Sequence, residues 1–334
     1  MNTSSHHLHN IISSSLLALV CSSAIAADGP PPPTVNQPSG INLGNTSFYD
    51  GFGGPPGLKH SVYLLHSRAT SFIDSNGHDN KSFDDPEFSA TMLLNQFTYH
   101  SPKTIGGGGH LGWDIAIPII SLDANFGNRG PQLQDTGTGF GDIALGPIIQ
   151  FDPIVNAQGR PTFIQRLALS VSLPIGEYDE TKDFNLGTNF YSVNPSWAAT
   201  WMPAERWEIS WRLQYIYNFK NNDPASSIPM VFNGNSVRDT QAGQAAWSNF
   251  AASYEFIPNI SVGLSGYYLK QLEDDKVNGE RLESSQETVL GIGPGLFWKI
   301  SEKQLFWLNA YHETEVENRP SNDFSIQARF AYAF

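Results

Sequence analysis

The sequence of 334 residues has one cysteine, few basic residues and no long apolar run beyond its N-terminus. Cys21 lies in a segment that we expect to be removed on export, so the mature chain would have no thiol for catalysis, disulfides or metal binding. No stretch of about 20 apolar residues follows the N-terminus, which excludes a bundle of membrane helices. The net charge of -13, from 19 Lys and Arg against 32 Asp and Glu, argues against nucleic acid as a partner, because that binding needs basic patches.

The first 26 residues have the features of a signal peptide. Residues 11–20 form an apolar core, and residues 24–26, Ala-Ile-Ala, match an A-x-A cleavage pattern. We therefore expect the mature chain to begin at Ala27. Val20 stands where a lipoprotein needs a small residue before its cysteine, so we expect no lipid on Cys21.

The last twelve residues, 323–334, alternate strictly between two kinds of side chain. One face is apolar and aromatic and the other is small or polar, with Arg329 as its charge. Period-two alternation over this length predicts a strand with a different solvent on each face. A final strand that ends in Phe resembles those of bacterial outer-membrane barrels, in which the assembly machinery reads it. The resemblance implies that Phe334 is such a signal and that the protein lies in the outer membrane.

About twelve strand-like runs fill residues 60–334, an even number that is typical of a single-chain outer-membrane barrel. A hydrophobic content of 40% and an aromatic content of 12% suit a barrel, because only half of each strand faces lipid. Short turns follow Trp201, Phe256 and Ile300, and long loops lie between them, although the turns at 101–109 and 152–160 are longer. We therefore predict an all-β, antiparallel transmembrane β-barrel. The expected strands are residues 61–72, 87–99, 110–122, 140–151, 162–175, 190–201, 206–219, 246–256, 259–272, 287–300, 303–315 and 323–334.

If the apolar face of each strand meets lipid, the polar face lines the lumen. After the last strand, strand 206–219 alternates most clearly, and it has Trp and Tyr at its ends, as in the aromatic girdles of barrels. Gly291, Gly293 and Gly295 would leave space in the lumen. Opposed inward arginines and acids also pair simply to fill a small barrel, so each charged candidate has a structural alternative. The lumen-lining candidates are Asp114, Asp142, Arg166, Arg212, Gln214, Gln327 and Arg329.

Residues 27–59 are rich in proline and glycine, with the runs PPPP, NQPSG, INLG and DGFGGPPG. Proline lacks a backbone donor and glycine costs entropy in regular elements, so this segment reads as an irregular arm. Two interpretations stay open. The arm is either a disordered periplasmic tail or a plug in the barrel, for which Phe48, Tyr49 and Phe52 supply apolar side chains.

The string TGTGFGDIALGP at residues 136–147 is the most distinctive in the chain. It is not a phosphate loop, because no Lys-Ser/Thr and no helix start follow it. Together with SLPIGEYD, NLGTN, VGLSGYYLKQ, GIGP and the terminal Phe, it resembles the outer-membrane proteins of the phenol meta-pathway degradation family. The resemblance implies a barrel that helps aromatic or other hydrophobic small molecules cross the outer membrane. The motif residues are Gly139, Gly141, Gly146, Pro147, Asn185, Gly187, Asn189, Gly293 and Phe334.

Other functions fit the sequence less well. His100, His110 and His312 do not stand with Ser and Asn in a recognisable motif, so we predict no enzyme and no cofactor. The acidic segment 273–283 has interleaved basic residues and lacks the spacing of a calcium loop, so we predict no metal site. The predicted function is passive uptake of small hydrophobic solutes, aromatic ones included. The rival is a non-transporting structural or adhesion barrel. Expected partners are outer-membrane lipid, lipopolysaccharide and the assembly machinery.

Overall fold

The computed structural model describes residues 35, 37, 38, 41–127, 132–226, 228 and 230–334. The described residues form strands, turns and loops, and no helix among them is long and apolar enough to cross a membrane. The predicted signal peptide, residues 1–26, and the cleavage site at Ala27 lie outside the described residues.

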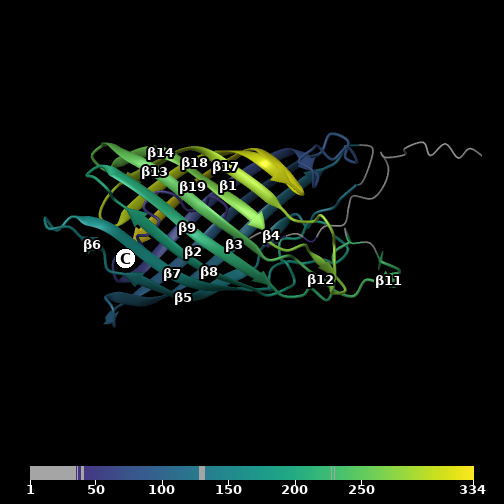
Figure 1. Cartoon of the computed structure of the whole chain (residues 1–334), viewed down its shortest axis with the longest axis horizontal. Coiled ribbons are helices and arrows are strands. Elements are labelled where there is room, and N and C mark those ends of the chain that lie inside the picture. Colours follow the sequence, from purple (N-terminus) through teal and green to yellow (C-terminus); the bar gives the residue numbers. More distant parts are fainter. Residues whose placement is uncertain (1–34, 36, 39–40, 128–131, 227, 229) are drawn as a thin grey trace, which may run out of the picture.

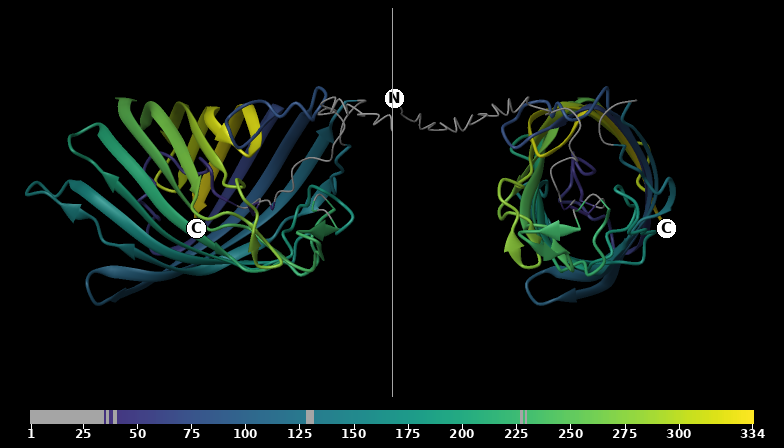
Figure 2. Two further views of the ribbon diagram at one scale, coloured as in Figure 1. Left: turned by 45° about the vertical axis from the view of Figure 1, so that its right-hand side comes forward. Right: turned by 90° about the vertical axis from the view of Figure 1, so that its right-hand side faces the viewer.

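The predicted all-β barrel is confirmed (Figures 1 and 2). The main sheet has 14 strands, of which β4 and β6 are short pieces, and the other twelve form a closed antiparallel barrel. Consecutive strands pair, and the barrel closes where β1 pairs with β19. The barrel strands are β1 (Gly57–Ile73), β2 (Glu87–Ile105), β3 (Gly109–Asn125), β5 (Ile143–Phe151), β7 (Pro161–Leu173), β8 (Ser192–Trp201), β9 (Trp207–Asn218), β13 (Ala245–Ile257), β14 (Ile260–Gln271), β17 (Thr288–Lys299), β18 (Gln304–Glu317) and β19 (Arg319–Ala333).

Seven short strands lie in the connections between the barrel strands. β4 pairs with β3, β6 with β7, and β10 with β11, while β12, β15 and β16 form a small sheet. They are β4 (Thr138–Phe140), β6 (Ile154–Val155), β10 (Val231–Phe232), β11 (Asn235–Ser236), β12 (Thr240–Gln241), β15 (Lys276–Val277) and β16 (Glu280–Arg281).

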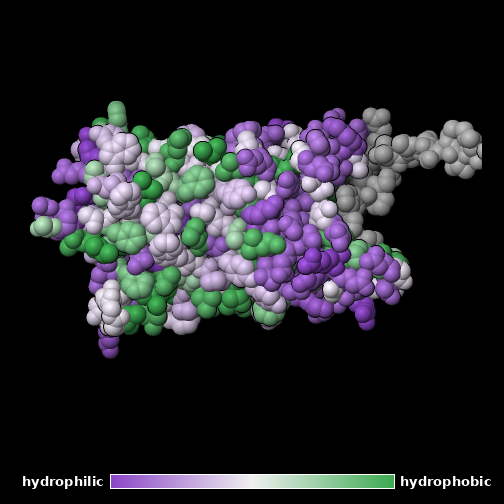
Figure 3. All heavy atoms as spheres, viewed as in Figure 1, coloured by the Kyte–Doolittle hydropathy of each residue, from purple (hydrophilic) through white to green (hydrophobic). Residues whose placement is uncertain are grey.

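The two faces of the strands separate as the alternation predicts. In β9, Glu208, Arg212 and Gln214 are buried in the barrel, whereas Trp207 and Leu213 are exposed on its outside. The exposed apolar residues gather on the barrel wall, and hydrophilic residues gather at the end that carries the long loops (Figure 3). An outer wall of this kind, with polar side chains inside, is the arrangement that a lipid bilayer selects.

The two ends of the barrel carry different connections. We call the end with residues 106–108, 152–160, 202–206, 258–259 and 300–303 the turn end. The opposite end, with residues 74–86, 126–142, 174–191, 219–244 and 272–287, is the loop end.

Three connections differ from the sequence prediction. The turn expected at 101–109 is mostly strand, because β2 continues to Ile105 and β3 begins at Gly109. The turn expected at 152–160 contains β6, which extends the hairpin with β7. At the loop end, a single residue, Asn318, joins β18 to β19 where a longer loop was expected. Asn318 has φ 55°, a left-handed conformation that Asn tolerates better than most residues, so the hairpin can close tightly.

Prolines inside the strands interrupt the pairing between neighbours. Pro147 in β5 falls in a gap of the register with β7, and Pro294 in β17 falls in a gap with β18. Proline has no N–H to donate to the ladder, which explains both gaps. The preceding motif glycines fit the same places. A Cβ at Gly146 would lie 1.8 Å from Leu169 O, and one at Gly293 would lie 1.8 Å from Ala310 O, so a side chain at either position would displace the neighbouring strand.

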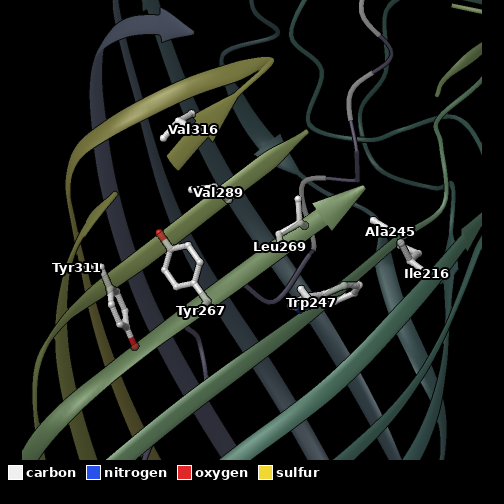
Figure 4. Close-up of a cluster of buried hydrophobic side chains, with 8 residues drawn as sticks. All are labelled: Ile216, Ala245, Trp247, Tyr267, Leu269, Val289, Tyr311 and Val316. Atoms are coloured by element: carbon white, nitrogen blue, oxygen red, sulfur yellow. The ribbon is translucent and has the colours of Figure 1, made fainter. Parts of the chain in front are cut away.

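The arm enters the barrel at the loop end and runs through the lumen to the turn end, where β1 begins. Residues 41–53 lie inside the ring of strands (Figure 2). Ile41 and Leu43 pack against a cluster of buried side chains on the inner wall of β9, β13, β14, β17 and β18 (Figure 4). Phe48, fully buried, packs against a second cluster that includes Phe297 and Trp307. Much of the apolar core is therefore formed between the arm and one side of the wall.

A single charged substitution tests whether the outward face of β9 contacts lipid. Leu213→Arg places a cation on the outer wall in the middle of β9, and we expect the barrel to lose about 2–4 kcal/mol of unfolding free energy in lipid vesicles. Met230→Arg makes the same change in an exposed loop and should have little effect. Urea titration of both variants in vesicles measures the difference. Equal stabilities would mean that Leu213 does not face lipid.

Candidate functional site

The arm has no regular structure, and side chains of the barrel wall satisfy its backbone groups. Gly44 N donates to Asn249 Oδ1 at 3.0 Å, and Tyr311 Oη donates to Gly44 O at 2.9 Å. Farther along, Trp307 Nε1 donates to Phe48 O at 2.9 Å. Buried backbone polar groups without partners are costly, so these bonds fix the path of the arm through the lumen.

Glycines allow the arm to lie directly against the wall near the turn end. A Cβ at Gly51 would lie 2.5 Å from Ile164 O, and one at Gly53 would lie 2.3 Å from Gln150 Oε1. Hydrogen bonds from the backbone N–H groups of the same two glycines explain why the arm lies so close to the wall. Gly51 N donates to Thr200 Oγ1 at 2.9 Å, and Gly53 N donates to Gln150 Oε1 at 2.6 Å. From the sequence, these glycines predicted only irregular structure, not contact with the wall.

The centre of the lumen holds a buried ion pair between the arm and the wall. Arg212 Nε and Nη2 each donate to the carboxylate of Asp50 at 2.7 Å. Arg166 Nη2 lies 3.5 Å from Asp50 Oδ1 and donates to the backbone oxygen of Asp50 at 3.3 Å. Asp50 is 4% exposed. A buried charge needs such partners, so this contact determines the position of the arm.

Arg166 and Arg212 were predicted to face the lumen, and the structure brings them together on Asp50. Acids of facing strands were the expected partners, and Asp50 of the arm was not predicted. One signal was present in the sequence: Asp50 is the acid of the DGFGGPPG run, in an arm whose aromatic side chains already favoured burial.

The other predicted lumen residues have different surroundings. Asp114 accepts hydrogen bonds from Gln96 Nε2 at 2.5 Å and from Thr98 Oγ1 at 2.6 Å. Gln327 Nε2 donates to the arm, at Leu43 O, over 2.9 Å. Arg329 lies with its guanidinium 3.5 Å from the ring centroid of Trp307.

Gln214 and Phe334 complete the positions predicted on the barrel strands. Gln214 lines an internal cavity, and its Nε2 atom has no hydrogen-bond partner among the described residues. Phe334 is 66% exposed at the turn end, and its N–H donates to Leu58 O at 3.0 Å.

Asp142 was predicted to line the lumen; it is not among the residues that line the cavity beside the arm. It lies at the loop end, where its Oδ1 accepts from Gly176 N at 2.9 Å and its Oδ2 accepts from Thr188 N at 2.9 Å. A carboxylate with backbone donors on both oxygens has a structural task there, which is to tie the loop at 174–191 to the start of β5. The period-two pattern could not reveal this, because Asp142 precedes the regular part of the strand.

The glycines of the family motifs converge around Asp142. A Cβ at Gly141 would lie 2.8 Å from Ile120 Cδ1, and one at Gly187 would lie 2.8 Å from Gly176 C. A Cβ at Gly139 would lie 2.0 Å from Glu177 Oε1. Three motifs that are separate in the sequence therefore form one junction in which backbones touch.

Asn185 and Asn189 secure the loop that these motifs share. Asn185 Oδ1 accepts from Asp179 N at 2.8 Å. Asn189 has φ 60°, and its Nδ2 atom donates to Asn221 Oδ1 at 2.9 Å. Both residues thus have structural roles at the loop end.

The lumen is not completely filled by the arm. A cavity of about 470 Å³, the inner cavity, remains beside it. On one side the inner cavity meets small side chains of β3, β5, β7 and β8; on the other it meets the arm and aromatic residues of β1, β17 and β18. The small residues are Ala116, Ala144, Ala168, Ser170, Ser172 and Ser196, and the aromatic ones of β1, β17 and β18 are Tyr63, Phe297 and Trp307; Trp247 of β13 also lines the cavity.

A second cavity of about 280 Å³ lies at the loop end. Phe88, Phe184 and Phe190 line it together with Val35 and Ile41 of the arm. We call this second cavity the mouth. Aromatic rings pack around it, among them Phe88 against Phe184 at a centroid distance of 5.0 Å. The mouth therefore offers an apolar surface.

Asp275 holds the arm at the same end. Its Oδ2 atom accepts from Val35 N at 3.2 Å, and its Oδ1 atom accepts from Gly243 N at 2.8 Å. Burial raises the pKa of the Asp275 carboxyl to about 8, in opposition to the two backbone donors. In the described part of the chain, no group of three or more His, Cys, Asp or Glu side chains is placed to hold a metal ion.

The Asp50 pair leads to a prediction about the arm. Asp50→Ala leaves two buried arginines without their carboxylate, a change that costs on the order of 3–5 kcal/mol. We expect chymotrypsin to cut the arm at Phe48 and Tyr49 at least tenfold faster in the folded barrel.

The control is Asp79→Ala, which removes an exposed partner of Lys81 and should leave the cutting rate unchanged. Equal protection of the arm in both variants would show that the Asp50 pair does not hold it.

Comparisons with known proteins agree with this architecture. The chain is similar to an outer-membrane channel of Pseudomonas putida F1, with 18% identity, a TM-score of 0.69, and coverage of 86% of this chain and 98% of that one. At this identity the likeness shows the fold alone. Two further likenesses are too weak to add to the description of the fold. They are to the translocator domain of the autotransporter NalP of Neisseria meningitidis (10% identity, TM-score 0.45, coverage 84% and 90%) and to the TodX monoaromatic hydrocarbon channel (8%, 0.40, 84% and 91%).

No curated protein sequence matches the chain. A family profile does match, over residues 70–330. These residues make up most of the chain and include every barrel motif that the sequence analysis singled out, apart from the terminal Phe. The protein therefore belongs to the family described as "Putative MetA-pathway of phenol degradation".

Proposed function

We propose that the protein is an outer-membrane channel through which small hydrophobic compounds, aromatic ones included, enter the cell passively. The observation that carries the proposal is the inner cavity, which runs beside the arm and combines small, aromatic and polar side chains. Hydrophobic solutes cross the polysaccharide side of an outer membrane slowly. A barrel with a partly apolar interior provides a path around that barrier.

The two cavities and the family support the proposal together. The aromatic mouth at the loop end presents an apolar surface at the entrance to the lumen, and Pro38 and Ile41 of the arm line both cavities. The family description refers to phenol degradation, which favours aromatic solutes. In this proposal, no step requires catalysis or a cofactor.

The proposal places the barrel in the outer membrane, after export by the signal peptide. The exposed terminal Phe334 is then available to the assembly machinery, and the outer wall contacts lipid and lipopolysaccharide. The turn end would face the periplasm and the loop end the exterior, since short turns inside and long loops outside are the rule for such barrels.

The rival function is a barrel that transports nothing and serves as a structural or adhesion element. One observation favours it: the arm occupies the lumen and forms much of the core with the wall. The difference between the two functions lies in whether the remaining space is used.

Filling that space tests the proposal. Ala144 lies on the small side of the inner cavity, so Ala144→Trp should obstruct it and reduce uptake of a radiolabelled aromatic compound severalfold in whole cells. Ala328→Trp adds the same ring to the outward face of β19 and should leave uptake unchanged. Uptake is measured in cells that lack the native gene and express each variant to the same level.

Equal uptake by cells with wild-type protein, with Ala144→Trp and with no barrel would remove the transport proposal and favour the structural one. Whole cells are needed because a phospholipid vesicle lacks the lipopolysaccharide barrier.

A further inference from the structure

The inner cavity has a surplus of positive charge, although the whole chain has a net charge of -13. Lys59, Arg166, Arg212 and Arg329 face it from four barrel strands, whereas the acids that line it away from the turns, among the described residues, are Asp50 and Asp114. Charges in a confined, poorly solvated space act strongly on one another and on any solute that enters.

The two central acids are already engaged. Asp50 is held by both oxygens on Arg212 and lies beside Arg166. Asp114 accepts from the neutral side chains of Gln96 and Thr98. They therefore leave two of the four cations without a carboxylate.

Those two cations are Lys59 and Arg329. Lys59 Nζ donates to the backbone oxygen of Gly53 at 2.8 Å, which is a neutral partner. Arg329 stacks on Trp307 and has no carboxylate within ion-pair distance among the described residues; its Nε atom is buried without a hydrogen-bond partner. Gln214 faces the same cavity and is 6% exposed, and its buried donor Nε2 has no partner in the described part of the chain.

The charges at the turn end of the cavity lower this surplus by one acid, Glu255, but do not cancel it. Lys299 pairs with Glu302 at 2.7 Å. Glu255 Oε1 accepts from Asn259 N at 2.8 Å. These groups lie at or beside the turns. Lys59 lies near the same end, at the third residue of β1, whereas Arg329 lies farther into the barrel, opposite Tyr63.

Apolar surface adjoins the unpaired cations. Tyr63 and Trp307 flank the guanidinium of Arg329, at 5.6 Å and 3.5 Å from their ring centroids. The opposite side of the cavity carries small side chains and has room for a flat ring. A neutral hydrocarbon would use the apolar surface but would leave the unpaired donors unsatisfied.

We propose that the inner cavity binds organic carboxylates with an apolar body, such as aromatic acids, with the carboxylate on Arg329 and Lys59. Gln214 Nε2 supplies a neutral donor on the same cavity. This inference rests on the proposed function and gives it a solute class: the preferred cargo is an aromatic anion, which an arginine binds through charge-assisted hydrogen bonds.

A binding measurement tests the site without depending on transport. The purified, folded barrel in detergent micelles is titrated calorimetrically with benzoate and with benzyl alcohol, a neutral compound of similar size, and titrations of empty micelles are subtracted. We expect benzoate to bind at least about tenfold more tightly than benzyl alcohol, and more weakly as salt is added. Equal affinities for the two compounds would overturn the proposal.

Substitutions locate the charge that matters. Arg329→Gln should weaken benzoate binding about tenfold, and Arg329→Lys should retain most of it, because the charge is kept. Arg68→Gln removes an arginine that pairs with Glu87 on an exposed part of β1 and should have no effect. Heat-shifted migration on gels confirms that each variant is folded. If both Arg329→Gln and Arg68→Gln weaken benzoate binding to the same extent, or if neither weakens it, the proposed carboxylate site is wrong.

The result separates this inference from the proposed function. Benzoate binding without aromatic uptake in cells would keep the site and remove the channel. Uptake of neutral aromatic compounds without benzoate binding would keep the channel and remove the carboxylate site.

Discussion

The structure depends on one constraint: a charge inside a narrow barrel must be paired or solvated. Arg212 and Arg166 project into the lumen from neighbouring parts of the wall, and their partner is Asp50 of the arm. Removing a buried partner is expensive, whereas the intact pair contributes little net stability by itself. The pair is therefore best understood as a device that fixes position. It holds an irregular segment at one level of the lumen, and the hydrogen bonds and glycine contacts of the arm then follow.

The fixed arm divides the lumen unequally. Most of its apolar contacts are with β13, β14, β17, β18 and β19, where buried aromatic and aliphatic side chains cover it. The wall on the side of β3, β5 and β7 carries Ala and Ser, which are too short to reach across. The arm is therefore packed where the wall carries large side chains, and the inner cavity remains where the wall carries small ones. A barrel with large residues on all sides would be filled, and one with small residues on all sides would not hold the arm.

The fold could be predicted from the sequence because its signal is local. Alternation along residues 206–219 and 323–334 records the two solvents on either side of each strand, and it identifies the inward residues directly. The partners of those residues are not local. Arg212 is separated from Asp50 by 162 positions, and no periodicity in β9 points to an acid in a glycine-rich arm. The partners of Asp142, Gly176 and Thr188, are distant for the same reason: they belong to a loop that follows another strand. The motif glycines were recognised, but the close backbone contacts that require them appear only in three dimensions.

The arm also determines the charge that a solute meets. With the arm docked, Asp50 neutralises part of the charge of Arg212 and Arg166, and the backbone oxygen of Gly53 accepts a hydrogen bond from Lys59 Nζ. With the arm withdrawn, the four cations of the wall would lose the carboxylate of Asp50, and Asp114 and Glu208 would remain as buried acids of the wall. Like charges at close range repel strongly where water is scarce, so the undocked lumen would be less stable and more attractive to anions. Docking of the arm and binding of an anion thus act on the same group of charges. Asp50 of the arm acts as the counterion of Arg212 and Arg166. In our proposal, a carboxylate solute supplies the counterion for Lys59 and Arg329.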